Sequence, residues 1–83
     1  MDRGVLAAVQ RFPERGSEIR RLALADTTFR GLCDDLLEAE AALARWKQEL
    51  APRSVERQRE YEQLVRELTD EIAAVLSQAS PSG

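Results

Sequence analysis

The fold is decided by two stretches of sequence: FRGLCDDLLEAEAALARWKQEL (residues 29–50) and YEQLVRELTDEIAAVLSQA (residues 61–79). In each stretch apolar residues recur at alternating gaps of three and four, which keeps one apolar stripe in line along a helix. The first stripe consists of Phe29, Leu32, Leu36, Ala39, Leu43, Trp46 and Leu50, and the second of Tyr61, Val65, Leu68, Ile72, Val75 and Ala79. The pattern predicts an all-α fold, a long antiparallel and coiled-coil-like helical hairpin over residues 26–79 with its turn at 51–53.

One antiparallel register fits the whole hairpin. A tip near Pro52 pairs residues that lie at equal distances from it along the chain, and the apolar pairs fall in the middle of the hairpin. The pairs include Trp46 with Gln58, Leu43 with Tyr61, Ala39 with Val65, Leu36 with Leu68 and Leu32 with Ile72. We expect the first helix to end near Leu50, because Pro52 disfavours helix for the residue before it. Ser54 is the expected N-cap of the second.

Residues 1–25 are predicted to form a shorter N-terminal helical arm, and residues 80–83 a disordered tail. A first short helix over residues 4–12 should stop before Pro13, and a second should start at Pro13 or Ser17. Two interpretations of Asp26 stay open. The residue caps a new helix, or one long helix runs from about residue 14 to about residue 50. We favour the break.

Charge is distributed unevenly along the chain. Residues 45–59 at the tip carry five basic and two acidic side chains, whereas residues 26–40 carry five acidic and one basic. The first 21 residues are net basic and include Arg20 and Arg21. A break at Asp26 would let this arm fold back onto the acidic open end of the hairpin, and this favours the break.

The length and composition of the chain exclude several classes of function. The 83 residues make at most one domain, and the 33% charged and 43% hydrophobic residues suit an exposed helical protein. The net charge of −3 argues against general nucleic-acid binding. One cysteine cannot form an internal disulfide, and no apolar run is long enough for a membrane span or a secretory signal. We expect a cytoplasmic protein without membrane contact.

No constellation of residues points to catalysis. The chain has no histidine, the commonest acid–base group. Asp34, Asp35 and Glu38 are interpreted as a solvated acidic face rather than a metal site. Cys33 lies beside the seam, the line along which the apolar stripes of the two helices meet. Its negatively charged neighbours disfavour a thiolate, so we interpret it as a packing residue. The sequence predicts no enzyme, no cofactor and no metal site.

Several residues together resemble the YdcH-like family of small bacterial helical-hairpin proteins. They are Phe12-Pro13-Glu14, Ile19, Leu22, Asp26, Phe29, Leu32, Leu64, Leu68 and Ile72, and the similarity spans roughly residues 12–76. The stretch Ala41–Lys47 departs from the acidic and lysine-rich run expected there, which makes the chain a divergent member. The resemblance implies a bacterial, cytosolic helical hairpin and carries over no catalytic residue.

The predicted function is a non-catalytic protein–protein interaction or scaffold module that acts through helical surfaces. Apolar residues off the seam at Cys33, Leu37, Leu64 and Leu76 need a cover, which either the arm or a second copy of the chain supplies. Trp46 faces polar Gln58 and either anchors a partner or caps the core. The candidate partner-binding residues are Trp46, Arg45, Lys47, Arg53, Arg57, Leu37 and Leu76. The alternatives are a coiled-coil regulator of a large enzyme such as RNA polymerase, and weak nucleic-acid binding through the basic tip.

Overall fold

Short-range capping signals set the ends of the first helices. The computed structural model describes residues 2–79, and its first helix is α1 (Arg3–Arg11). The Asp2 carboxylate accepts hydrogen bonds from the amides of Gly4 (2.8 Å) and Val5 (3.3 Å) and so caps this helix. Phe12, which precedes Pro13, leaves the helical conformation and ends it. A 3-10 turn, η1 (Pro13–Arg15), leads directly into α2 (Gly16–Ala25).

The helix is interrupted at Asp26, the interpretation that the sequence favoured. Asp26 has an extended conformation, and its carboxylate accepts hydrogen bonds from the amides of Thr28 (2.9 Å) and Phe29 (3.3 Å). It is therefore the N-cap of α3 (Thr27–Gln48). The chain then returns through α4 (Ser54–Ala79).

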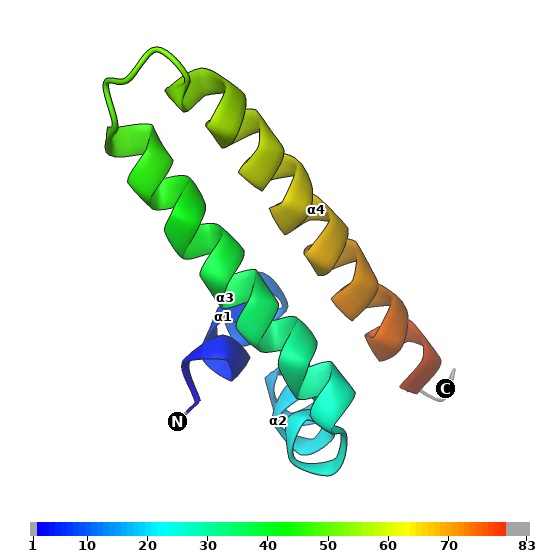
Figure 1. The fold of residues 1–83 in the computed structure, drawn as a ribbon. Coiled ribbons are helices and arrows are strands. Elements are labelled where there is room, and N and C mark those ends of the chain that lie inside the picture. The colour runs from blue at the N-terminus through cyan, green and yellow to red at the C-terminus, as the bar shows by residue number, and fades with distance from the viewer. Residues whose placement is uncertain (1, 80–83) are drawn as a thin grey trace.

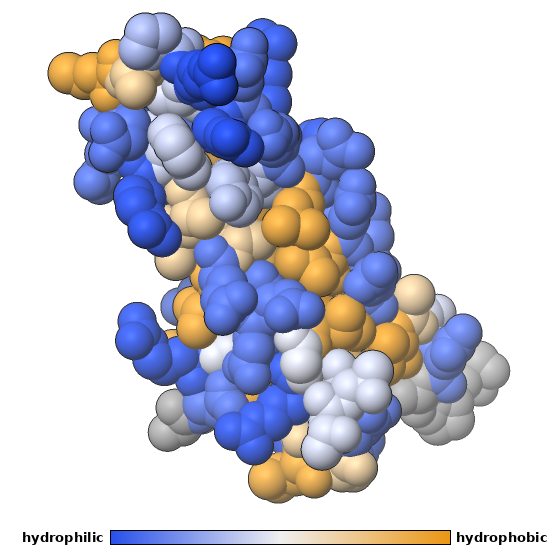
Figure 2. All heavy atoms as spheres, in the orientation of Figure 1, coloured by the Kyte–Doolittle hydropathy of each residue, from blue (hydrophilic) through white to orange (hydrophobic). Residues whose placement is uncertain are grey.

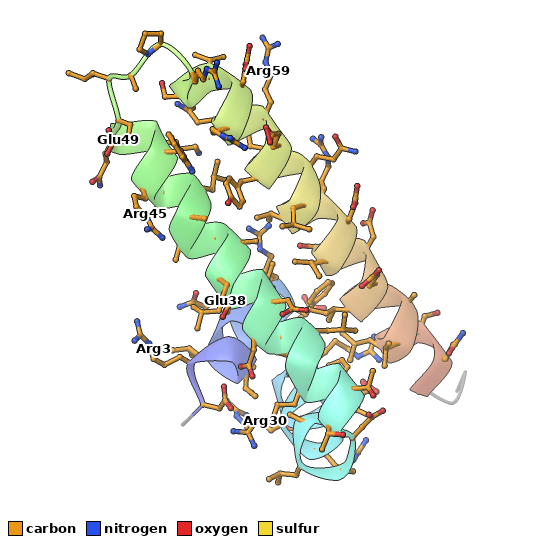
Figure 3. The ribbon with its side chains drawn as sticks, viewed as in Figure 1. Arg3, Arg30, Glu38, Arg45, Glu49 and Arg59 are labelled. Atoms are coloured by element: carbon orange, nitrogen blue, oxygen red, sulfur yellow. The ribbon has the colours of Figure 1, made fainter. Side chains whose placement is uncertain are left out.

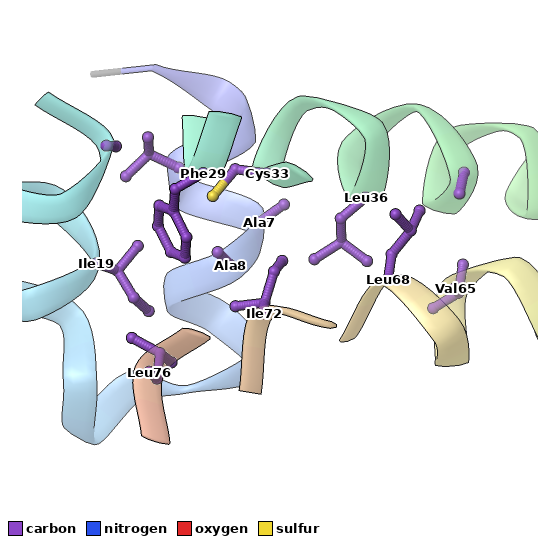
Figure 4. Packing of buried hydrophobic residues seen from close by; sticks show 13 residues of the cluster. Ala7, Ala8, Ile19, Phe29, Cys33, Leu36, Val65, Leu68, Ile72 and Leu76 are labelled. Carbon is purple, nitrogen blue, oxygen red and sulfur yellow. The ribbon is translucent and has the colours of Figure 1, made fainter. Parts of the chain in front are cut away.

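The predicted all-α fold with its antiparallel hairpin is confirmed. Helices α3 and α4 pack side by side, and the described residues contain no strand (Figure 1). The side-chain amide of Gln58 donates a hydrogen bond to the carbonyl of Trp46 at 3.3 Å, which joins two residues that the register pairs. Leu36 and Leu68, another pair of that register, lie together in the core (Figure 4).

The turn differs from the expectation. Helix α3 ends at Gln48 rather than Leu50, and Leu50 is 99% exposed. Its register partner would be Ser54, which offers no apolar contact. No packing therefore stabilises the last predicted helical turn, and Pro52 disfavours helix for the residue before it. Ser54 is itself buried as the first residue of α4, and the Arg53 carbonyl accepts the first helical hydrogen bond, from the Arg57 amide. The capping position therefore belongs to Arg53.

The arm folds back onto the open end of the hairpin, where it packs mainly on α3 (Figure 1). Two ion pairs join α1 and its cap to α3: Arg11 with Glu40 and Arg30 with Asp2, both at 2.7 Å. The expected fold-back is thus present, but Arg20 and Arg21 are exposed rather than engaged with the acidic end.

The core lies where the arm meets the hairpin. Ala7, Ala8 and Ile19 of the arm contribute to the same buried cluster as the seam residues (Figure 4). The largest fully buried side chains are Ile19, Phe29, Cys33, Leu36, Ile72 and Leu76. Within residues 2–79, no helix has the length and apolarity needed to cross a membrane. The predicted tail, residues 80–83, lies outside the described residues.

Candidate functional site

The structure separates the candidate partner-binding residues into three groups. Arg45, Lys47, Arg53 and Arg57 are exposed around the tip. Trp46 and Leu37 are half-buried, and Leu37 packs against the edge of the core. Leu76 is only 1% exposed. In this fold Leu76 therefore offers no surface to a partner, and its place among the candidates is corrected.

The arm is what covers Leu76. Ile19 of α2 lies next to it in the core (Figure 4). Arg15, in the η1 turn, donates a hydrogen bond to the Leu76 carbonyl at 2.8 Å and is itself held by Glu18. The sequence left open whether the arm or a second copy of the chain buries the residues off the seam. On this side of the hairpin the arm buries them.

Cys33 is part of the same covered side. Its side chain has no exposed surface and lies between Phe29 and Ala7 (Figure 4). Burial raises the pKa of the Cys33 thiol to about 11, and the nearby negative charges of Asp34 and Asp2 act in the same direction. A thiol held in this protonated form is a packing group rather than a nucleophile.

The two flanks of the hairpin seam are therefore unequal. We call the side that carries Cys33 and Leu76 the arm-covered flank. The opposite side, which carries Ala42 and Leu64, is the open flank. Leu64 is 39% exposed even though it is as far off the seam as Leu76. The difference comes from the arm, which packs against one flank only.

A groove runs along the open flank between α3 and α4. Its central part encloses about 560 Å³ and continues toward the tip into a second hollow of about 540 Å³ that shares Ala42, Arg45 and Tyr61 with it. We call the two together the α3–α4 groove. Its lining residues are Asp35, Glu38, Ala39, Ala41, Ala42, Arg45, Trp46, Glu49, Ala51, Tyr61, Leu64 and Leu68.

The groove arises from an imbalance of side-chain size. In the central part of the groove the apolar residues of the α3 wall are all alanines (Ala39, Ala41 and Ala42), whereas α4 contributes Tyr61, Leu64 and Leu68. Small side chains on one helix cannot fill the space beside large ones on the other, so a hollow with an apolar floor is left. Figure 2 shows apolar side chains gathered between the two helices, with hydrophilic ones on either side.

Charged side chains form the rim of the groove on the α3 side. Glu38 lies toward the open end, and Arg45 lies toward the tip (Figure 3). Asp35 also lines this part of the groove. Among residues 2–79 these three side chains form no ion pair with another residue, unlike Glu40, which pairs with Arg11. They are therefore free to pair with a molecule that occupies the groove.

For Trp46 the sequence left two roles open, anchoring a partner or capping the core, and both stay predictions. The residue is half-buried, with its carbonyl bonded to Gln58, and it lines the tip end of the groove. Of the residues that line the groove, the sequence selected only Arg45 and Trp46 as site candidates, and it missed the apolar ones, Ala42, Tyr61 and Leu64 among them. The sequence signal that could have identified the groove is Leu64, a large apolar residue that lies off the seam and opposite several alanines of the first helix.

The acidic residues of α3 do not converge on a metal site. No group of three or more cysteine and carboxylate side chains with metal-binding geometry is present between residues 2 and 79. Asp34 is instead close to the backbone of α1 at Gly4. The described surface also has a smaller hollow of about 290 Å³ on the arm side, lined by Asp2, Val5, Arg20, Ala23, Leu24 and Arg30. The α3–α4 groove is the larger of the two and is the candidate site.

The chain was compared with known proteins, and no family model, curated protein or solved structure matches it. The resemblance to the YdcH-like family stays a prediction.

Proposed function

We propose that the chain is a non-catalytic protein–protein interaction or scaffold module of the bacterial cytoplasm, and that it binds its partner in the α3–α4 groove. The observation that carries the proposal is the hollow between α3 and α4, whose apolar lining includes the exposed Leu64. A concave apolar surface with a charged rim has the anatomy of a protein-binding site.

The residue types of the groove support this function. Tyrosine, tryptophan and arginine dominate the binding energy of protein interfaces, and the groove contains Tyr61, Trp46 and Arg45. A groove between helices accepts an amphipathic helix, whose apolar face would lie on Leu64 while its charged residues meet the rim.

The two alternatives have less support. Both use the hairpin tip, where Leu50 and Arg53 are exposed. Arg57 pairs with Glu60 at 3.2 Å, which reduces the positive field that the tip offers to nucleic acid. The connection between α3 and α4, residues 49–53, has a single carboxylate, Glu49, and also carries the basic Arg53. A coiled-coil regulator that manages a metal ion needs acidic residues at its tip, so the groove is the better candidate.

Site-specific photo-crosslinking tests the proposal. A photoreactive amino acid is placed at Leu64, inside the groove, in the full chain produced in its native host. The matched control places it at Arg66, an exposed residue two positions along the same helix and outside the residues that line the groove. We expect a discrete covalent adduct from position 64 and none from position 66.

A second variant links the adduct to the groove. Ala42→Arg would fill the hollow from the α3 side and should abolish the adduct at position 64 without loss of helicity by circular dichroism. If position 64 yields no adduct, or yields the same adducts as position 66, the proposed function is wrong.

A further inference from the structure

We propose that the occupant of the α3–α4 groove is a second copy of this chain, packed antiparallel about a two-fold axis beside Ala41 and Ala42. This inference rests on the proposed function and names the partner. In the dimer, Arg45 of each copy faces Glu38 of the other copy.

The first support is the spacing of the rim charges. Glu38 and Arg45 are both exposed on the groove rim and lie seven residues apart, about two helical turns or ~10 Å. When two α3 helices meet antiparallel with their centre between Ala41 and Ala42, position 38 falls opposite position 45 at both ends. Both ion pairs form in the same register, so the surface is self-complementary, as a two-fold interface requires.

The charge of the whole hairpin favours the same orientation. Residues 45–59 at the tip carry five basic and two acidic side chains, whereas residues 26–40 carry five acidic and one basic. An antiparallel dimer places each tip against the acidic half of the other copy. A parallel dimer would place tip against tip and acidic half against acidic half, which is repulsive.

The apolar surfaces also fit. Ala41 and Ala42 at the axis have short side chains, so the two α3 helices can approach closely. Each α3 would then lie over Leu64 and Tyr61 of the other copy and cover the floor of its groove. The result is a four-helix assembly in which α3 and α4 of each copy contribute equally. A different protein would have to bring the complementary charge pattern that this chain already carries.

The ion pairs are tested by charge reversal in the full chain, with association followed by sedimentation equilibrium. We expect the wild-type chain to reach twice the mass of one chain as its concentration rises. Arg45→Glu alone and Glu38→Arg alone should each raise the dimer dissociation constant by roughly tenfold or more, because both symmetric pairs become repulsive. Arg66→Glu reverses an exposed basic residue that lies outside both the groove and the basic tip, so it is the matched control and should leave the constant within about twofold.

Two complementation experiments make the test specific. The double variant Glu38→Arg/Arg45→Glu should dimerise like the wild type, because the reversed pairs are again complementary. A mixture of the Arg45→Glu chain with the Glu38→Arg chain should form mixed dimers although each chain alone dimerises weakly. Circular dichroism of every variant verifies that helicity is retained.

The outcomes distinguish this inference from the proposed function. A wild-type chain that stays monomeric, a dimer that ignores charge reversal at positions 38 and 45, or a mixture that does not associate would each overturn the inference. If the crosslinked adduct from position 64 then contains a different protein, the interaction function stands while the second copy is excluded. An adduct of two identical chains supports both.

Discussion

The open end and the tip of the hairpin carry the same heptad pattern but bury it to different extents. Leu36 of the open half has no exposed surface, whereas Leu43, one heptad further along the same helix, is half-buried. The half-buried Leu43 pairs with half-buried Tyr61 in the register, while Leu36 pairs with buried Leu68. The difference is the arm, which adds a third layer at the open end only. Two helices make a seam, but a third layer is needed to exclude water from it.

The sharpest way to test this comparison is to truncate the two leucines. Leu36→Ala should lower the free energy of unfolding by about 3 kcal/mol, because it leaves a cavity in a fully buried site. Leu43→Ala should lower it by about 1 kcal/mol, because water already reaches that side chain. The measurement is urea denaturation at a protein concentration low enough to keep the chain monomeric.

The two variants control each other, because both replace leucine by alanine within α3 and change helix propensity equally. Equal losses would show that the tip half is packed as tightly as the open half. The comparison would then fail.

The docking of the arm can be broken at Gly4. A Cβ atom at this position would lie 2.9 Å from the Asp34 backbone and closer still to its carboxylate. Gly4→Ala should therefore push α1 away from α3 and lower the free energy of unfolding by about 2 kcal/mol. Urea denaturation measures the loss, and the rate at which a thiol reagent modifies Cys33 should rise because the arm covers this residue.

Gly31 supplies the matched control, since it is also a glycine within a helix but has no atom within 4 Å of an added Cβ. Gly31→Ala should raise the free energy of unfolding by up to about 1 kcal/mol through helix propensity alone. If Gly4→Ala behaves like Gly31→Ala, the close approach of α1 to α3 is not required for stability.

Alkaline pH should weaken the arm-covered flank selectively. The pKa of the Cys33 thiol rises from 9.0 to about 11 on folding, chiefly through burial. A raised folded-state pKa means that the stabilisation is complete below pH 9.0 and is lost as the pH rises toward about 11, because the unfolded chain releases the proton first. The expected loss is about 1–2 kcal/mol.

Cys33→Ala isolates this contribution from the other groups that titrate at high pH. The difference between the wild-type and Cys33→Ala unfolding free energies should shrink between pH 9 and pH 11. A difference that stays constant across this range would mean that the thiol is not buried in the folded protein.

The smallest effect is expected at the tip. Leu50 is 99% exposed, outside any helix, so Leu50→Ser should change the free energy of unfolding by less than about 0.5 kcal/mol. Thermal unfolding of the two proteins side by side measures the change. A larger loss would show that Leu50 packs onto the hairpin in solution, as the sequence pattern had predicted.

The sequence by itself determined the local elements and their pairing. Alternating gaps of three and four residues define one stripe per helix, and a short connection at Pro52 leaves the two stripes only one register. At Asp26 the capping signal left two interpretations open, and the structure shows the break. The residues before Pro13 mark a helix end because proline geometry, like the heptad spacing, acts over a few residues. These signals are short-range and can be read without the fold.

Only the tertiary structure decided which flank of the seam is covered. Leu64 and Leu76 are both leucines just off the stripe, and the spacing places them on opposite flanks without indicating which flank is covered, yet one is exposed and the other buried. The choice depends on where α1 docks, which is set by contacts between residues far apart in the chain, such as Gly4 beside Asp34 and Arg11 paired with Glu40. The groove on the other flank follows from that choice, because the arm can pack against one side of the hairpin and leaves the opposite side to solvent or a partner.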